Sequence, residues 1–328
     1  MVFSFDCSST TSCSMLVISS ISGLHDNRTN HITSFGSLEA WSTCFTVLLY
    51  TGLQSFRMLF TCSKLFTAYI LIICSNSIIV YLIWFHQNLH EPMYIFIAAL
   101  LVNSVLYSTN IYPKLLVDFL SEKQIISYSA CLFQCFLYYS LNSSEFLLLA
   151  AMSYDRYVSI CKPLQYHTIM RKTTVRIFLG VAWFAPACQI AVTVSIGALA
   201  KLCNFTLKGI FCNNLIYKLH CVSSIGLTVY GLSIFFNVTI LPLAFIIFSY
   251  TKIFIVLYHS CREVRMKAAQ TCIPHLLVLI SFSFLFTYDI VIVKLEIEFP
   301  KTTHLIMTLQ VILYHPLLNP IIYGLKMK

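Results

Sequence analysis

The stretch YYSLNSSEFLLLAAMSYDRYVSICKPL, residues 138–164, is apolar enough to lie in lipid, yet it carries polar residues along its whole length. Residues spaced by three or four positions lie on one face of a helix. In this stretch they are Tyr138, Asn142, Glu145, Leu149, Met152 and Arg156. At about 1.5 Å per residue, the first and last of them lie roughly 27 Å apart, close to the thickness of the hydrocarbon core of a bilayer. One helix face could therefore sense on one side of a membrane and report on the other.

The composition supports a membrane setting for the whole chain. Of its 328 residues, 58% are hydrophobic and only 10% are charged, whereas a soluble domain carries about 25% charged residues. The net charge of +9 comes from basic residues grouped in a few loops and gives no reason to expect nucleic-acid binding. Six of the 14 cysteines lie inside apolar segments, and none has the spacing of a zinc site. The sequence thus indicates an integral membrane protein without a metal centre or another cofactor.

Seven apolar segments each approach the roughly 20 residues that a spanning helix needs. They cover about residues 58–85, 93–116, 131–160, 175–196, 225–257, 272–293 and 303–323. The fold class predicted from them is an all-α membrane protein with a seven-transmembrane helix bundle. Basic residues are concentrated after the third segment, between the fifth and sixth, and after the seventh, and cytoplasmic loops carry such an excess. We therefore expect the N-terminus outside and the C-terminus in the cytoplasm.

Four cysteines are expected on the outer side: Cys131, and Cys203, Cys212 and Cys221 of the long loop between the fourth and fifth segments. Four cysteines allow three pairings, and the spacing does not choose among them. A bridge from Cys131 to this loop would hold it as a lid over the mouth of the bundle. Glycosylation sequons begin at Asn27 and Asn204 on the same side.

Several motifs resemble those of odorant receptors, a branch of the rhodopsin-like G-protein-coupled receptors. They are LHEPMYIF (residues 89–96), MSYDRYVSICKPLQY (residues 152–166), KAAQTCIPHL (residues 267–276) and HPLLNPIIYGLK (residues 315–326). The motifs occur in the family's order, on the expected helices, and the resemblance covers about residues 51–326. It implies an extracellular segment (residues 1–57), a receptor domain (residues 58–325) and a truncated cytoplasmic tail (residues 326–328). It also implies the disulfides Cys131–Cys212 and Cys203–Cys221.

The resemblance assigns a switch to the cytoplasmic half of the bundle. An ionised arginine at a membrane boundary is costly unless it is paired, and Asp155 is the immediate neighbour of Arg156. The family implies that activation frees this arginine for a heterotrimeric G protein of the stimulatory, olfactory type. The residues expected to form the switch are Asp155, Arg156, Tyr157, Tyr250, Asn319, Pro320 and Tyr323.

Ligand recognition is expected in the outer third of the bundle, where a small, largely apolar odorant would enter. The expected contacts are Tyr138, Tyr139, Asn142, Ser143, Ile234, Val238, Phe286 and Thr287. Deeper in the bundle, Glu145 needs a partner or a proton, because a charge there costs on the order of 3 kcal/mol. The family places a sodium ion near this acid, but Ser104 stands where the usual second carboxylate would be. A sodium ion and a hydrogen-bonded structural acid both remain open.

Two departures from the family pattern limit the resemblance. Phe282-Ser283-Phe284 replaces the FYG-like element of the sixth helix, and the chain stops five residues after Tyr323. A truncated or non-functional receptor product and a non-olfactory rhodopsin-like chemoreceptor are therefore alternatives. No nucleophile–base pair points to an enzyme, and no matching halves with broken helices point to a transporter. The expected location is the plasma membrane, crossed several times.

Overall fold

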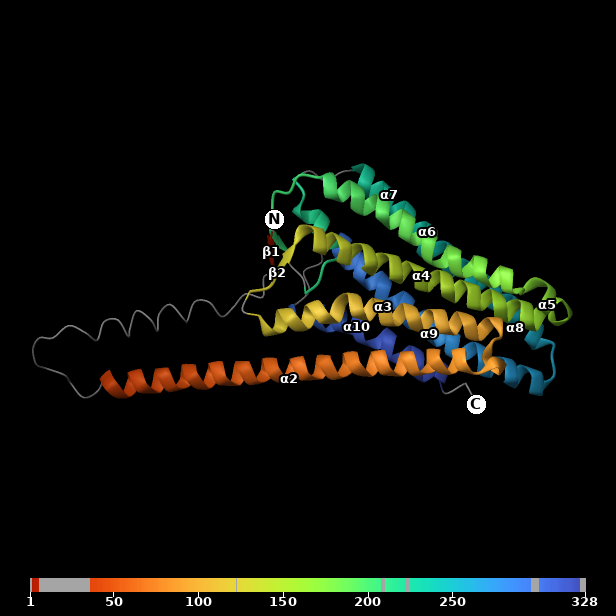
Figure 1. Cartoon of the computed structure of the whole chain (residues 1–328), viewed down its shortest axis with the longest axis horizontal. Coiled ribbons are helices and arrows are strands. Elements are labelled where there is room, and N and C mark those ends of the chain that lie inside the picture. Colours follow the sequence, from red (N-terminus) through yellow and green to blue (C-terminus); the bar gives the residue numbers. More distant parts are fainter. Residues whose placement is uncertain are drawn as a thin grey trace, which may run out of the picture.

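The computed structural model describes residues 2–5, 36–121, 123–207, 210–221, 225–295 and 301–324. The helices of the described part are α2 (Gly36–Phe85), η1 (Gln87–Leu89), α3 (Pro92–Leu120), α4 (Tyr128–Cys161), η2 (Pro163–Gln165), α5 (Tyr166–Ile169), α6 (Lys172–Leu199), η3 (Asn214–Leu219), α7 (Ile225–Phe235), η4 (Phe236–Ile240), α8 (Leu241–Tyr258), α9 (Arg262–Leu295) and α10 (Lys301–Gly324). Figure 1 shows the long helices side by side in an elongated bundle. Every predicted apolar segment lies within helix.

Helix α4 is the centre of this bundle. It packs against α3, α6, α8 and α9, whereas α2 packs against α3 and α10. Twenty of its residues are buried, including Tyr138, Asn142, Glu145, Leu149 and Met152. The predicted stripe of residues thus faces the interior over most of its length. A polar stripe is tolerated there because other helices, and not lipid, surround it.

Five stretches of the described residues are long and apolar enough to cross a membrane. They are Thr61–Phe85, Pro92–Leu120, Lys172–Leu199, Ile225–Tyr258 and Ala268–Thr287. Helix α4 has the length but is too polar to qualify by composition alone, since Asn142, Glu145, Asp155 and Arg156 lie along it. Its burial explains the difference, because a helix enclosed by its neighbours does not need an apolar surface on every side. The chain is a multi-pass helical membrane protein.

Some helices begin before the apolar segment that predicted them. Helix α9 begins at Arg262, ten residues before the predicted start at residue 272, because the charged turns that precede the apolar run are also helical. Helix α2 begins at Gly36 and extends beyond the other helices (Figure 1). The N-terminal part of α2 and the whole of β1 lie in the predicted extracellular segment (residues 1–57).

The purely α-helical prediction missed a small sheet. Strand β1 (Val2–Phe5) lies between β2 (Ile125–Ser127), to which it is antiparallel, and β3 (Thr206–Leu207), to which it is parallel. Strands of two to four residues are too short to show an alternating pattern in sequence. The sheet lies at one end of the bundle and α5 at the other (Figure 1); we call these the sheet end and the α5 end.

A π-helical turn, η4, interrupts the helix that runs from residue 225 to residue 258. Pro242 follows this turn and cannot donate a backbone hydrogen bond, so the regular ladder of the helix is broken here. Buried Val238 and Thr239 lie side by side in this turn, while Asn237 and Ile240 are exposed. The turn therefore brings two consecutive side chains into the bundle.

Candidate functional site

Buried side chains occupy most of the predicted ligand positions. On α4, Tyr138, Tyr139, Asn142 and Ser143 are all buried, with Tyr138 fully enclosed. Ile234 of α7 and Val238 of η4 are buried as well. The sequence prediction thus selected interior positions on these helices.

Of the two ligand positions predicted on α9, one is buried and the other is exposed. Phe286 is buried at 3% exposure, but its neighbour Thr287 is exposed. Consecutive residues of an α-helix point about 100° apart, so the two side chains do not share a face. Thr287 is therefore not part of the buried group, and its place is taken by Phe282, one turn before Phe286.

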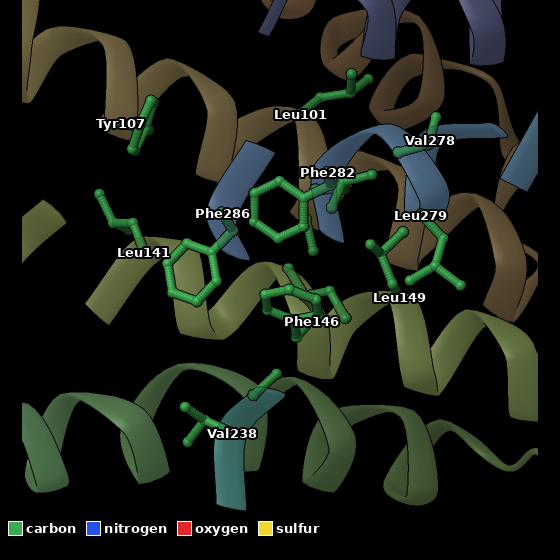
Figure 2. Close-up of a cluster of buried hydrophobic side chains, with 14 of the residues drawn as sticks. Leu101, Tyr107, Leu141, Phe146, Leu149, Val238, Val278, Leu279, Phe282 and Phe286 are labelled. Atoms are coloured by element: carbon green, nitrogen blue, oxygen red, sulfur yellow. The ribbon is translucent and has the colours of Figure 1, made fainter. Parts of the chain in front are cut away.

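Three phenylalanines form an aromatic cluster between α4 and α9, as Figure 2 shows. The ring centre of Phe146 lies 4.7 Å from that of Phe282 and 5.4 Å from that of Phe286. Phe282 and Phe286 lie 5.9 Å apart and are stacked. The sequence prediction named only Phe286, although the spacing of the two α9 phenylalanines already places them on one face. We call Phe146, Phe282 and Phe286 the aromatic cluster.

The loop before η3 reaches into the sheet end of the bundle. Phe211 is buried at 3% exposure and lies 5.0 Å, ring centre to ring centre, from Tyr138. On its other side Tyr138 contacts Tyr107 of α3 at 5.6 Å. Phe211 is a site residue that the sequence analysis did not name, and its position next to Cys212 was the available signal.

Covalent and hydrogen bonds fasten this loop to α4. The disulfides are Cys131–Cys212 and Cys203–Cys221, the pairing that the resemblance implied. The backbone N–H of Cys212 donates to Oε1 of Gln134 at 3.0 Å. The backbone N–H of Asn214 donates to the hydroxyl of Tyr139 at 3.1 Å. The loop is thus a fixed lid, and Tyr139 helps to hold it in place.

Tyr128 of α4 connects the lid to the sheet-end turn of α6. Its hydroxyl donates to the carbonyl of Gly197 in α6 at 2.8 Å and lies 3.4 Å from Nε2 of His220 in the lid. A Cβ atom on Gly197 would lie 3.1 Å from the Tyr217 ring, so glycine permits this close approach. Burial lowers the pKa of His220. His220 therefore stays neutral at a pH where an exposed histidine would be partly charged.

Polar side chains meet in the middle of the bundle. Nδ2 of Asn319 donates to Oγ of Ser104 at 3.0 Å and to Oε1 of Glu145 at 3.3 Å. Asn103 donates to the carbonyl of Leu141 at 3.0 Å, which joins α3 to α4. The four polar residues are at most 4% exposed, and Leu141 is 8% exposed. The structure thus brings Asn319, which was predicted as a switch residue, together with Glu145 and Ser104, which were predicted as one polar group.

An ion pair lies at the α5 end of α4. Arg156 donates to Oδ2 of Asp155 through both Nε, at 3.0 Å, and Nη2. The carboxylate is fully buried, and the hydroxyl of Tyr166 donates to its other oxygen at 2.8 Å. Burial raises the pKa of Tyr166, and the nearby Asp155 carboxylate raises it further. The phenol therefore stays protonated and remains a donor to Asp155.

The other predicted switch residues lie close to this half of the bundle. Tyr250 of α8 is hydrogen-bonded to Nδ1 of His275 on α9, and both residues are 3% exposed. Tyr323 is buried at 2% exposure, and Pro320 is buried beside Asn319 in α10. Tyr157 is half-buried, with its ring 6.4 Å from that of Tyr154. His275 was not predicted as the partner of Tyr250, although it lies in the KAAQTCIPHL motif.

The predicted glycosylation sites fall in different parts of the chain. Asn204 is exposed at the sheet end, and its Oδ1 accepts from the backbone N–H of Phe205 at 2.9 Å. Asn27 lies outside the described residues. Among the residues that the structure describes, no three His, Cys, Asp or Glu side chains are grouped to hold a metal ion.

A bundle of apolar helices around one buried polar helix, with an arginine–aspartate pair at its end, is typical of G-protein-coupled receptors. The family model described as "Olfactory receptor" matches residues 65–328. The chain is 34% identical to human Olfactory receptor 52A5 over 268 residues, which covers 79% of this chain and 84% of that protein. It is 32% identical to human Olfactory receptor 2A5 over 296 residues, which covers 88% of this chain and 93% of that protein. The chain belongs to the olfactory receptor family, whose members are not enzymes.

Proposed function

We propose that this protein is an odorant receptor that crosses the plasma membrane seven times and couples to a stimulatory, olfactory-type heterotrimeric G protein. The observation that carries the proposal is the arginine of α4, held by a fully buried carboxylate that Tyr166 also contacts. A buried, hydrogen-bonded ion pair is costly to break by removing one partner. Such a pair would stabilise the resting state. The receptor would leave that state only when another interaction compensates for the broken ion pair.

The ligand in this proposal is a small, largely apolar odorant bound between the lid and the aromatic cluster. The side chains that face this region are mostly aromatic or aliphatic, with a few hydroxyls and amides from α4. Pockets for small molecules commonly have this composition. A ligand shifts the receptor toward its active state only if it binds that state more tightly. We expect that difference to come from the aromatic cluster, because Phe282 and Phe286 would move with α9.

Signal transfer would then run through the α5 end. Outward movement of α9 would separate His275 from Tyr250 and leave the tyrosine hydroxyl available to Arg156. Pro320, which cannot donate a backbone hydrogen bond within α10, would allow Tyr323 to move toward the same point. The freed arginine would contact the G protein, together with Asp155 and Tyr157.

For Glu145 we propose the role of a hydrogen-bonded structural acid. An amide nitrogen, and not an oxygen, faces its carboxylate, since Asn319 donates to both Glu145 and Ser104. A sodium ion would need oxygen ligands in place of that donor. Sodium binding near Glu145 remains the second candidate, and it would require the Asn319 amide to rotate.

Replacing Tyr166 with phenylalanine should raise ligand-independent signalling. The change removes a hydrogen bond to an ionised carboxylate, worth about 1.5–3 kcal/mol, and the loss would fall mainly on the resting state. We expect basal cyclic AMP, normalised to receptor at the cell surface, to rise by a few fold. Tyr154→Phe is the matched control, because the contacts of Tyr154 in the described residues are made by its ring. Equal basal signals from both variants would remove Tyr166 from the resting-state lock.

The orientation can be tested at the sequon of the lid. With the N-terminus outside, Asn204 would face the compartment in which N-glycans are added. We expect Asn204→Gln to remove one glycan, seen as a faster-migrating band that matches enzymatically deglycosylated protein. Asn237→Gln is the control, because Asn237 begins a sequon inside a candidate membrane span. A receptor whose mobility does not respond to Asn204→Gln but does respond to the control would contradict the orientation.

A further inference from the structure

Thr239 carries a buried hydroxyl group that has no assigned role in the proposed binding site. It is 2% exposed, and its Oγ1 has no hydrogen-bond partner among the described residues. A threonine within a helix usually donates to a carbonyl one turn earlier. Thr251 on the same helix does so, with Oγ1 donating to the carbonyl of Ile247 at 2.8 Å. A buried hydroxyl without a partner is destabilising, so its presence calls for an explanation.

The π-helical turn explains why Thr239 faces the interior of the bundle. Wider π turns replace the regular hydrogen-bond ladder and occur often at functional sites. In η4 the turn places Thr239 next to Val238 on the inside, against α4. Val238 belongs to the buried group around the aromatic cluster in Figure 2. Thr239 therefore lies beside a region that is otherwise apolar.

The Tyr250–His275 hydrogen bond fixes the level of Thr239 along the bundle. Thr239 lies eleven residues before Tyr250, and Phe286 lies eleven residues after His275. Helices α8 and α9 are joined by a short turn and run in opposite directions. Eleven residues correspond to about 16 Å along either helix, so Thr239 and Phe286 lie at about the same level. The free hydroxyl is thus level with the aromatic cluster.

Some other buried hydroxyls without a partner among the described residues lie elsewhere in the bundle. Ser108 and Tyr112 of α3 are examples. The Tyr112 ring is stacked on Tyr69 of α2, with ring centres 5.3 Å apart, so this face of α3 is directed toward α2. Thr239 lies in η4, which packs against α4, at about the level of the aromatic cluster where the proposed ligand would lie.

We infer that the hydroxyl of Thr239 is the polar anchor for the ligand and that the preferred ligand is a small apolar molecule with one hydrogen-bonding oxygen, such as an aldehyde, a ketone or an alcohol. The inference rests on the proposed odorant site. The ligand oxygen would lie between η4 and α4, and its carbon skeleton would lie on the aromatic cluster. A hydrocarbon of the same shape would bind less tightly, because it leaves the hydroxyl unpaired.

The test uses purified full-length receptor without a G protein, so that a failure of coupling does not affect it. Melting temperatures of wild type and Thr239→Val are measured alone and with probes matched in carbon skeleton: octanal, octan-1-ol and octane, then benzaldehyde, benzyl alcohol and toluene. Valine has the shape of threonine without the hydroxyl. Thr251→Val is the control, because it removes a hydroxyl from the same helix that is already paired.

Without ligand, Thr239→Val should melt at or above the wild-type temperature, because it removes an unpaired buried hydroxyl. In wild type, an oxygenated probe should stabilise the receptor more than its hydrocarbon. In Thr239→Val that advantage should disappear, with binding of the oxygenated probe weakened about two- to tenfold. The Thr251→Val control should keep the wild-type preference.

Three results would overturn the inference. Thr239→Val could melt well below wild type, which would show that the hydroxyl is already hydrogen-bonded. The preference for oxygenated probes could survive in Thr239→Val. Finally, wild type could show no preference for any oxygenated probe over its hydrocarbon. The first two results would leave the proposed odorant receptor intact, because a ligand could still bind at the aromatic cluster through apolar contacts.

Discussion

Replacing Arg156 with alanine should abolish the ligand-evoked rise in cyclic AMP while the receptor still reaches the cell surface. The Arg156 side chain is 14% exposed, lies at the α5 end of α4 and contacts Asp155. Truncation removes the group that the G protein is proposed to contact after activation. It also leaves the Asp155 carboxylate with the Tyr166 hydroxyl as its donor. Cyclic AMP would be measured against ligand concentration and normalised to surface receptor.

The matched control for this variant is Arg176→Ala. Arg176 is exposed on α6 and belongs to the same group of basic residues that predicts the cytoplasmic side. Its loss removes the same charge without touching the ion pair, and we expect a response close to wild type. A normal ligand response from Arg156→Ala would show that the arginine is only a basic residue at a helix end. Equal losses from both variants would point to a general effect of charge.

Breaking the Cys131–Cys212 disulfide should remove most receptor from the cell surface. The bridge closes a segment with a sequence separation of 81, and constraining a loop of that length is worth about 4.5 kcal/mol. Cys131→Ser would also release the lid from α4, together with Phe211 and the contact between Cys212 and Gln134. Surface labelling of intact cells would measure the loss.

The second bridge provides an internal comparison. Cys203 and Cys221 are separated by 18 residues, so their bridge is worth about 3 kcal/mol, and it lies within the loop. We expect Cys203→Ser to lower surface receptor less than Cys131→Ser. The double variant Cys131→Ser, Cys212→Ser should behave like either single variant, because one bridge is lost in all three. A clear additive loss in the double variant would contradict the pairing.

The sequence predicted the helices and the central stripe well because both depend on simple periodic patterns. Tyr138, Asn142 and Glu145 are spaced to share a helix face, and the structure buries all of them. The apolar runs also located each long helix. Helix α4 shows the limit of composition, since its polar residues are explained only by the helices around it.

The parts of the site that were missed depend on contacts between distant segments. Apart from the neighbouring Cys212, the local sequence does not indicate that Phe211 lies on Tyr138. It also does not indicate that Tyr166 donates to Asp155 across a turn. The position of Thr239 depends on the π turn that precedes Pro242, which the apolar pattern of this segment did not indicate. Thr287 was expected inside because it lies at a depth similar to that of Phe286, but the side chain that shares the inner face, Phe282, lies one turn away.

The central claim is that a small molecule at the sheet end of α4 controls a G protein through Arg156 at the other end. The most direct measurement is guanine nucleotide exchange on a purified stimulatory G protein, with receptor reconstituted in lipid vesicles and an odorant panel as ligand. The claim predicts odorant-dependent exchange with wild type and Arg176→Ala, and none with Arg156→Ala. Exchange that is independent of every odorant, or equal with and without Arg156, would contradict it.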